Sequence, residues 1–511
     1  MKVKGAIAAG HESTVKAAEA ILSAGGNAFD AAIAAHFAAC VAEPVLASLG
    51  GGGFMLAKPA AAKPILYDFF VQTPQQKNVA TDVDFHPIQA DFGETIQEFH
   101  VGTASIATPG SVRGMFEIHR DLGIMPMTLL MEPAIEAAKE GVKVNSFQAY
   151  IFDVVSPILG HTPEAKRLFG DGEKIFTHNN TMHMPELADV LDSLAHEGPD
   201  LFYQGEIAAS IHQLSESRGG HIQRGDLESY RVIKRKPMMC EYQSQTFITN
   251  PAPSSGGLLI ALALDLLQHS NIGQFQQGSG EHLTLLSAVM EQTNKARLDA
   301  LIAGNLDHTV LSPDFLAQYK THVYQRAQSL RGTTHISIAD AQGNMASLTV
   351  SNGEGCGHII PNSGIMLNNM LGEEDLNPQG FHQWQCDQRM TSMMAPSLLL
   401  DKNGHGICIG SGGSNRLRTA ILQTIINHYE FDLPLDEAIR YPRIHNENGV
   451  LNIEPGYDQS TLDNLEQQHS NIKHWNDVNL FFGGTHVVER NARGFGAVGD
   501  PRRGGQAVIV Q

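Results

Sequence analysis

The sequence predicts an α+β protein in which stacked sheets are flanked by helices. Three observations support this fold class. Helical periodicity dominates residues 12–41 and 110–235, and two alternating strands occupy 333–351. The elements follow one another without the regular strand–helix–strand rhythm of a parallel sheet. With 511 residues, 42% of them hydrophobic, the chain can bury a large core.

The first elements expected are two helices joined by glycines. Residues 12–24 place four apolar side chains on one helical face: Val15, Ala18, Ile21 and Leu22. Gly25 and Gly26 end that helix, and Asn27 can cap a second helix. The second helix is apolar on almost every face, which predicts that it is covered on most sides. The segment 54–70 then becomes strand-like.

Three later elements are also clear. The turn PAPSSGG at 251–257 opens an apolar helix, and we interpret Ser254 and Ser255 as a turn and helix cap rather than a catalytic serine pair. The segment 333–351 is a hairpin whose turn lies at 340–344. A further helix is expected at 418–430.

Composition restricts the partners. A formal net charge of −19, without Lys and Arg runs interleaved with aromatics, excludes nucleic acid. The five cysteines form no CxxC pair and indicate free thiols in a reducing compartment. The N-terminus lacks a secretory apolar region, and the longest apolar run, 28–41, is too short to span a bilayer. We therefore expect a cytoplasmic protein without a membrane partner.

Several familiar catalytic motifs do not occur in the sequence. It contains no HExxH, no GxxxxGK[ST] and no GxSxG. The 24 histidines show no metal-ligand spacing, so neither a metal nor a cofactor is expected. The four glycines at 50–53 indicate a tight turn against another backbone.

The segment from Gly332 to Ser337 carries the first chemical signal. A glycine before a threonine at the start of a strand allows the Thr333 hydroxyl to attack the Gly332 carbonyl, so that the chain cuts itself. The new Thr333 would carry both a nucleophile and a base, because an α-amine has a pKa of about 7.7–8.0. By itself, Gly-Thr-Thr is more often an ordinary strand start.

A second signal is the run 410–416, GSGGSNR, directly before the helix at 418. Glycines there allow backbone N–H groups to converge at a helix N-terminus. Such a nest suits the oxyanion of acyl transfer, and it equally suits a phosphate-binding or structural loop.

Six motifs, in order along the whole chain, resemble the gamma-glutamyltransferases, also called glutathione hydrolases. They are GGNAFDAA at 25, LGGGGFML at 49, PAPSSGG at 251, TTHISIADAQGN at 333, SGIMLNN at 363 and GDPRR at 499. The resemblance implies a four-layer αββα sandwich of the N-terminal-nucleophile hydrolase type. It also implies cleavage between Gly332 and Thr333 into a large subunit, 1–332, and a small subunit, 333–511, which together form one αββα unit.

The same resemblance implies roles for individual residues. Thr333 stands as the nucleophile, Ser351 where a helper threonine hydroxyl supports it, and Gly413 with Ser414 where backbone N–H groups hold the oxyanion. Asn352 is a candidate for substrate contact. The small-molecule substrate is an amide, glutathione-like or another acylated amine, and a further oligomer is possible. Relatives are often exported, in contrast to the cytoplasmic location expected here.

The chain departs from the family pattern at the substrate site. Phe70 in Tyr67-Asp68-Phe69-Phe70 stands where the family has an arginine that clamps the substrate carboxylate, so the bidentate cation is missing. The carboxylate that grips the α-ammonium falls at or beside Glu373, and Met370 replaces a glutamine. A paired serine motif survives as Ser392 followed by Met393.

These departures leave alternatives. The leading hypothesis is a self-cleaved enzyme that passes a gamma-glutamyl or related acyl group from an acyl-threonine to water or an amine. Arg389, Arg416 or Arg113 could replace the missing clamp. A cephalosporin or glutaryl acylase with Phe70 and Met370 in an apolar acyl pocket is the second hypothesis. A non-catalytic binding relative is the third.

Overall fold

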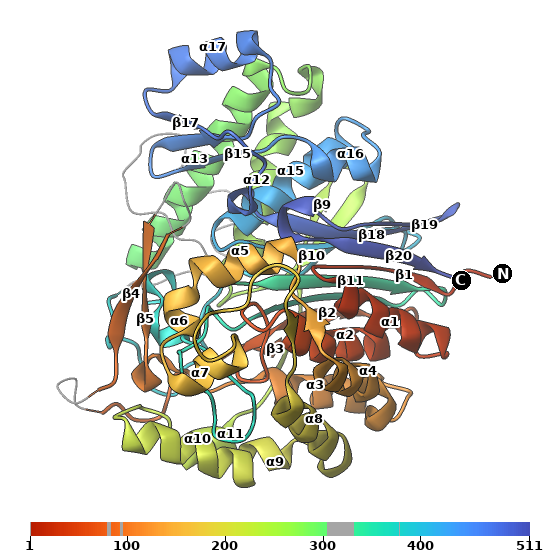
Figure 1. Ribbon diagram of the computed structural model, residues 1–511. Coiled ribbons are helices and arrows are strands. Elements are labelled where there is room, and N and C mark those ends of the chain that lie inside the picture. Colours follow the sequence, from red (N-terminus) through yellow and green to blue (C-terminus); the bar gives the residue numbers. More distant parts are fainter. Residues whose placement is uncertain (1, 79–82, 92–95, 304–331, 378) are drawn as a thin grey trace.

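Two antiparallel sheets stack face to face, with helices on both outer faces (Figure 1). The computed structural model describes residues 2–78, 83–91, 96–303, 332–377 and 379–511. The arrangement is a four-layer αββα sandwich and confirms the predicted α+β class. The polar stretch 321–331 before the expected cleavage point lies outside the described residues.

The first sheet is built from both parts of the chain. Its strands, in spatial order, are β20 (Gln506–Val510), β1 (Gly5–Ala9), β11 (Thr334–Asp340), β12 (Met345–Ser351), β2 (Gly52–Lys58), β3 (Ile65–Phe69) and β8 (Ile233–Arg235). The predicted hairpin is therefore central: β11 pairs with β12, with Thr334 opposite Val350, and β1 pairs with β11 on the other side.

The second sheet packs on the first through β14 and β18. Its order is β19 (Gly494–Val498), β18 (Gly484–Asn491), β14 (Gly406–Gly412), β13 (Ser397–Leu400), β10 (Gln245–Thr249) and β9 (Met238–Tyr242). Polar contacts join the layers as well as apolar ones. Ser337 Oγ on β11 lies 3.0 Å from the carbonyl oxygen of Cys408 and 2.9 Å from that of His486. The hairpin is thus fixed between the two layers.

Helices cover the outer face of each sheet. On the first sheet lie α1 (Glu12–Ser23), α2 (Ala28–Ala42) and α3 (Ser111–Leu122), and α4 (Met127–Glu140) packs against α2. Beyond them follow α5 (Ser146–Val154), α6 (Ser156–Leu159), α7 (Pro163–Leu168), α8 (Pro185–Glu197), α9 (Asp200–Tyr203), α10 (Glu206–Ser217) and α11 (Arg224–Ser229). On the second sheet lie α12 (Gly256–Ser270), α15 (Arg416–Tyr429) and α16 (Leu435–Arg440), with α13 (Gly280–Ala303) and α17 (Gln459–Gln468) farther out.

Three small sheets complete the structure. They are β15 (Ile444–Glu447) with β16 (Val450–Ile453) and β17 (Ile472–His474), β4 (His86–Asp91) with β5 (Ile96–Val101), and β6 (Val142–Lys143) with β7 (Thr181–Met182). Within the described residues, none of the helices combines the length and the apolar composition that crossing a bilayer requires.

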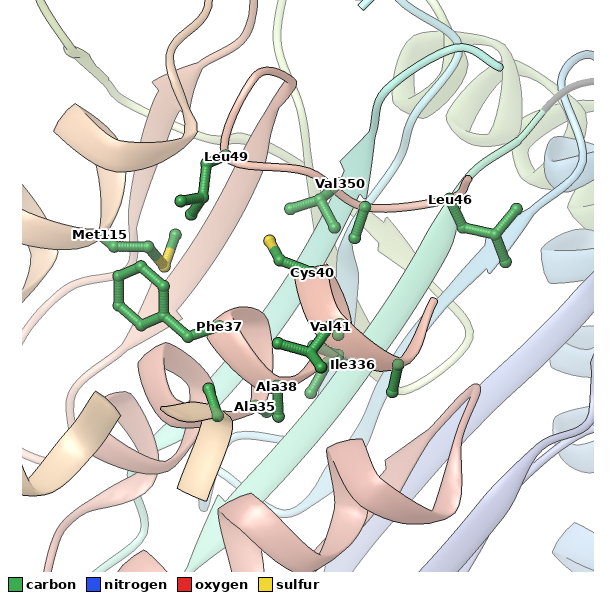
Figure 2. Packing of buried hydrophobic residues seen from close by; sticks show 14 of the residues in the cluster. Ala35, Phe37, Ala38, Cys40, Val41, Leu46, Leu49, Met115, Ile336 and Val350 are labelled. Carbon is green, nitrogen blue, oxygen red and sulfur yellow. The ribbon is translucent and has the colours of Figure 1, made fainter. Parts of the chain in front are cut away.

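Helix α2 supports the central hairpin directly. Every residue of α2 is buried, because alanines allow α1, α4 and the sheet to approach it closely, as its all-round apolar pattern predicts. Figure 2 shows Val41 of α2, Ile336 of β11 and Val350 of β12 in one cluster of buried side chains. The Asn27 side chain accepts from the N–H groups of Phe29 and Asp30 and begins the helix with the expected cap. The core thus holds the strands that carry the candidate nucleophile.

Candidate active site

The hairpin places Thr333 and Ser351 side by side. Thr333 directly precedes β11, and Ser351 is the last residue of the neighbouring strand β12. Both side chains are buried, Thr333 at 4% exposure. Since both residues are fixed at the end of a central, helix-supported hairpin, their relative position is rigid, as a catalytic pair requires.

Gly332, the residue before Thr333, is held by both its carbonyl group and its N–H group. Ser351 Oγ donates to the carbonyl oxygen of Gly332 at 2.6 Å, and the Gly332 N–H donates to Glu354 Oε1 at 2.7 Å. A Cβ at Gly332 would overlap the carbonyl oxygen of Gly353, so the position requires glycine. A hydroxyl that polarises this carbonyl assists attack on its carbon, and Thr333 Oγ belongs to the next residue along the chain.

The other side of Thr333 contacts buried charges. Arg503 Nη1 donates to the Thr333 carbonyl oxygen at 3.3 Å, and a Cβ at Gly412 would overlap that same oxygen. Thr334 Oγ1 donates to Glu43 Oε2 at 2.8 Å. Burial raises the pKa of Glu43 to about 6, although hydrogen bonds and Arg503 oppose the shift. Burial lowers the pKa of Arg503 to about 10, which leaves it a cation at neutral pH.

The two arginines of the motif GDPRR make different contacts. Arg502 belongs to an ion-paired structural turn, because it pairs with Glu454 at 2.6 Å and with Asp500 at 3.3 Å, all three buried. Arg503 instead points to Thr333. The contact escaped the sequence analysis because 170 residues separate its partners.

A cavity opens beside Thr333. Its lining consists of Phe70, Thr333, Ser351, Met370, Glu373, Leu376, Ser392, Met393, Met394, Ser414 and Leu417. The volume is about 20 Å³, room for one water molecule. Six of the site residues expected from the sequence therefore meet here. Asn352 is not among them, since its Nδ2 donates to the Met366 carbonyl oxygen at 3.4 Å.

The expected nest lies next to the same cavity. Gly413 and Ser414 adopt positive φ angles of 121° and 54° between the end of β14 and the start of α15. Left-handed residues also occur in anion-binding nests, in which successive backbone N–H groups converge on an anion. Ser414 lines the cavity, and its hydroxyl donates to Asp375 Oδ2 at 3.2 Å. The arrangement can hold an oxyanion formed next to Thr333.

Charge in the cavity is one-sided. Among the described residues that line it, Glu373 is the one ionisable side chain, and it is 2% exposed. None of the three arginines considered as a replacement clamp is in the lining. Arg113 pairs with Asp200 at 3.2 Å, and Arg416 donates to the Phe481 carbonyl oxygen at 3.2 Å.

Arg389, the third of these arginines, contacts Phe70 through the backbone of Phe70 and not through the cavity. Its Nη1 donates to the Phe70 carbonyl oxygen at 2.7 Å and to Asp68 Oδ1 at 3.1 Å. Asp68 is fully buried and also accepts from Arg235 at 2.8 Å. Arg389 therefore positions the backbone of Phe70 and does not place its own cation in the cavity. The Phe70 ring stacks on Phe54.

The serine pair of PAPSSGG holds another part of the lining. The hydroxyls of Ser254 and Ser255 lie 2.8 and 3.4 Å from the Ser392 carbonyl oxygen. The expectation that they cap the following helix is wrong, because Ser255 occupies the N-cap position of α12 without a side-chain cap bond. The nearby carbonyl of Ser392 takes these donors instead, and the loop from Ser392 to Met394 is thereby fixed at the cavity.

Comparison with known proteins identifies a family and several similar proteins. The family model for gamma-glutamyltranspeptidase matches residues 14–510. The chain is 31% identical to the glutathione hydrolase proenzyme of Pseudomonas aeruginosa over 87% of this chain and 83% of that protein. It is 27% identical to the acylase ACY 1 proenzyme of Pseudomonas sp. strain SE83 over 88% of this chain and 84% of that protein.

The fold is also that of a solved relative. The cephalosporin acylase from Bacillus halodurans superposes with a TM-score of 0.84 at 22% identity, covering 99% of this chain and 96% of the other. A family model that spans nearly the whole chain confirms the resemblance carried by the six motifs. This chain belongs to the gamma-glutamyltranspeptidase family.

Proposed function

We propose that the protein is a precursor that cuts itself between Gly332 and Thr333 and then acts as an amide hydrolase or acyl transferase. In the first step Thr333 Oγ attacks the Gly332 carbonyl carbon, the C–N bond breaks, and the hydroxyl proton passes to the departing nitrogen. Water then hydrolyses the resulting ester, leaving a carboxylate on Gly332 and a free amine and hydroxyl on Thr333. The observation that carries this proposal is the 2.6 Å hydrogen bond from Ser351 Oγ to the Gly332 carbonyl oxygen.

The free α-amine of Thr333 serves as the base in turnover. It accepts the proton of Thr333 Oγ as the oxygen attacks the substrate amide, and it returns the proton to the leaving amine. The N–H groups of Gly413 and Ser414 hold the oxyanion, supported by their conformation beside the cavity. Water or a second amine then takes the acyl group from the threonine ester.

The acyl donor is a gamma-glutamyl amide or a related amide of a small molecule. Glu373 supports recognition of a substrate ammonium group, since it is the charged side chain in the described lining. Ser392 and Asn352 complete the proposed substrate contacts. Ser392 lies in the lining of the cavity, and Asn352 is the residue directly after Ser351. The Pseudomonas aeruginosa relative is named a glutathione hydrolase, which fits such a donor.

An acylase with an apolar acyl pocket is the second candidate. Phe70 occupies the place of a carboxylate clamp, and Met370, Met393 and Met394 line the same cavity. A desolvated substrate carboxylate without a cation would be costly there, by several kcal/mol. Methionine side chains are flexible, so they can move aside for an acyl group larger than the present cavity. Two similar proteins, from Pseudomonas sp. strains SE83 and V22, are named acylase ACY 1 proenzymes.

Hydrolysis of a panel of anilides tests both candidates. The panel contains gamma-glutamyl, glutaryl and aliphatic anilides, with a Thr333→Ala variant as the blank. Preference for the gamma-glutamyl compound supports the first candidate, and preference for acyl groups without an α-amine supports the acylase. Absence of Thr333-dependent turnover on every member contradicts both and leaves a non-catalytic relative.

The two proposed subunits, 1–332 and 333–511, would remain interleaved after cleavage. Strands β11 and β12 of the second lie between β1 and β2 of the first. The cytoplasmic location stays a prediction, supported by five unpaired cysteines.

A further inference from the structure

A cluster of metal-ligating side chains lies apart from the candidate active site. Asp84 precedes β4, His161 follows α6, and His358 belongs to the segment after β12. The ligand atoms of all three lie within 4.8 Å of one another. Figure 1 shows β4 next to α6, where the first two segments meet.

The fold holds this cluster in place. The Thr103 N–H donates to Asp84 Oδ2 at 2.9 Å, and the same oxygen lies 2.9 Å from His358 Nε2. Gly357 has φ of 81°, and a Cβ there would lie 2.9 Å from His161, so glycine lets the two histidines approach each other. The His358 side chain is 4% exposed. The three groups are therefore oriented by the backbone and by packing rather than by chance contact on the surface.

The donor set suits a borderline divalent cation. Two imidazoles and one carboxylate are typical ligands of Zn²⁺ in an open site, with metal–ligand bonds of about 2.0–2.2 Å. The ligand atoms are already within 4.8 Å of one another. Small side-chain rotations would therefore let a cation between them make bonds of that length. The other oxygen of Asp84 lies 2.9 Å from His86 Nε2, a hydrogen bond of the kind that orients a ligating carboxylate.

A cavity borders the cluster at His358. This residue lines a space of about 640 Å³, the walls of which include Glu164, Glu186, Arg167 and Arg218. The two carboxylates offset the two guanidinium groups, so the cavity does not carry a net charge that would repel a cation.

We propose that Asp84, His161 and His358 form a binding site for one Zn²⁺-like cation, with water from the cavity as a further ligand. The cation replaces the contact between Asp84 Oδ2 and His358 Nε2. A proton on His358 Nε2 then moves to Nδ1 of the same ring. Bound metal ties the β4 hairpin and the turn after α6 to the segment that follows Ser351. The histidine spacing in the sequence did not indicate the site, because its ligands come from three distant segments.

Zinc binding to the chelator-treated full-length protein tests the site. We expect one Zn²⁺ per chain to remain after gel filtration, and Co²⁺ to give the visible absorption of a four-coordinate nitrogen and oxygen site. His161→Ala and His358→Ala should weaken Zn²⁺ binding by at least about tenfold. Zinc should also raise the thermal midpoint of the wild type and not that of these variants.

His183→Ala is the matched control. His183 lines the same cavity, and its Nδ1 lies near the Lys139 carbonyl oxygen at 3.2 Å, outside the cluster. It should bind zinc like the wild type. If the wild type retains no stoichiometric zinc, or if all variants retain as much as the wild type, the proposal is overturned. Because His358 is buried, the half-buried His161 decides the outcome should the His358 variant fail to fold.

Discussion

Removal of the Ser351 hydroxyl should slow self-cleavage without preventing folding. In the precursor this hydroxyl donates to the Gly332 carbonyl oxygen at 2.6 Å. That oxygen gains negative charge when Thr333 Oγ attacks, so the hydrogen bond strengthens in the transition state. Loss of one such donor typically costs about 2.7–4 kcal/mol, or about 10²–10³ in rate. Because Ser351 already binds the ground state, we expect the lower end, about a hundredfold.

A time course of freshly synthesised precursor measures this rate. Samples of Ser351→Ala and wild type are taken during cell-free synthesis, and the two fragments are quantified by denaturing electrophoresis. Ser351→Thr keeps a hydroxyl and should cleave at close to the wild-type rate. Ser347→Ala is the matched control, because Ser347 is a buried serine of the same strand whose Oγ donates to the Ile409 carbonyl oxygen.

Two outcomes would refute this reasoning. In the first, Ser351→Ala cleaves as fast as the wild type, which shows that the hydrogen bond has no part in the reaction. In the second, Ser347→Ala is slowed as much as Ser351→Ala, which shows that loss of any buried serine suffices. The Gly353 N–H also donates to Ser351 Oγ, at 3.1 Å, so some loss of stability is expected. Thermal unfolding of each variant separates that loss from the change in rate.

Three further predictions follow from buried contacts. Glu43→Gln should stabilise the protein by up to about 2 kcal/mol at pH 7.5, because burial raises the pKa of Glu43 from 4.5 to about 6 and the native state loses stability as pH rises through that range. Thermal unfolding should show that the gain vanishes below pH 4.5, and an equal gain at both pH values would contradict the prediction. Gly412→Ala should slow self-cleavage at least about tenfold in the same electrophoretic assay, since the Cβ of the new alanine overlaps the Thr333 carbonyl oxygen and small displacements of reacting groups slow a reaction. An unchanged rate would argue against the close approach of Gly412 to Thr333. Arg389→Met should lower the free energy of unfolding by about 3 kcal/mol, the lower end for a broken buried ion pair, because Arg235 still pairs with Asp68. A thermal midpoint equal to that of the wild type would count against the ion pair between Arg389 and Asp68.

Local elements were predictable because their signals are local. The two N-terminal helices follow from four apolar side chains on one face of the first, from the glycines that end it, and from the all-round apolar pattern and Asn27 cap of the second. The hairpin of β11 and β12 follows from alternating residues around a turn with Gly343, which has φ of 96°. Their bounds agree with expectation to within a few residues.

Long-range pairing was not predictable in the same way. Strand β1 is buried on both faces, so it lacks the alternation that marks a strand, and it pairs with β11 more than 300 residues away. Its partner is determined by the assembled sheets rather than by neighbouring residues. The hairpin of β4 and β5 also escaped the sequence analysis, although its two strands are neighbours along the chain.

The candidate site divides along the same line. Motif resemblance indicated Thr333, Ser351, Ser414 and Glu373, and the structure brings these residues to one cavity, where their roles remain proposals. Arg503 and the other buried groups that contact Thr333 and its neighbours were not expected, since each reaches the hairpin from a distant segment.

The most direct test is the mature protein itself. Denaturing electrophoresis with N-terminal sequencing should show two fragments, of 332 and 179 residues, the second beginning at Thr333, while Thr333→Ala stays whole. A wild-type chain that remains unbroken and still hydrolyses an amide would contradict the account.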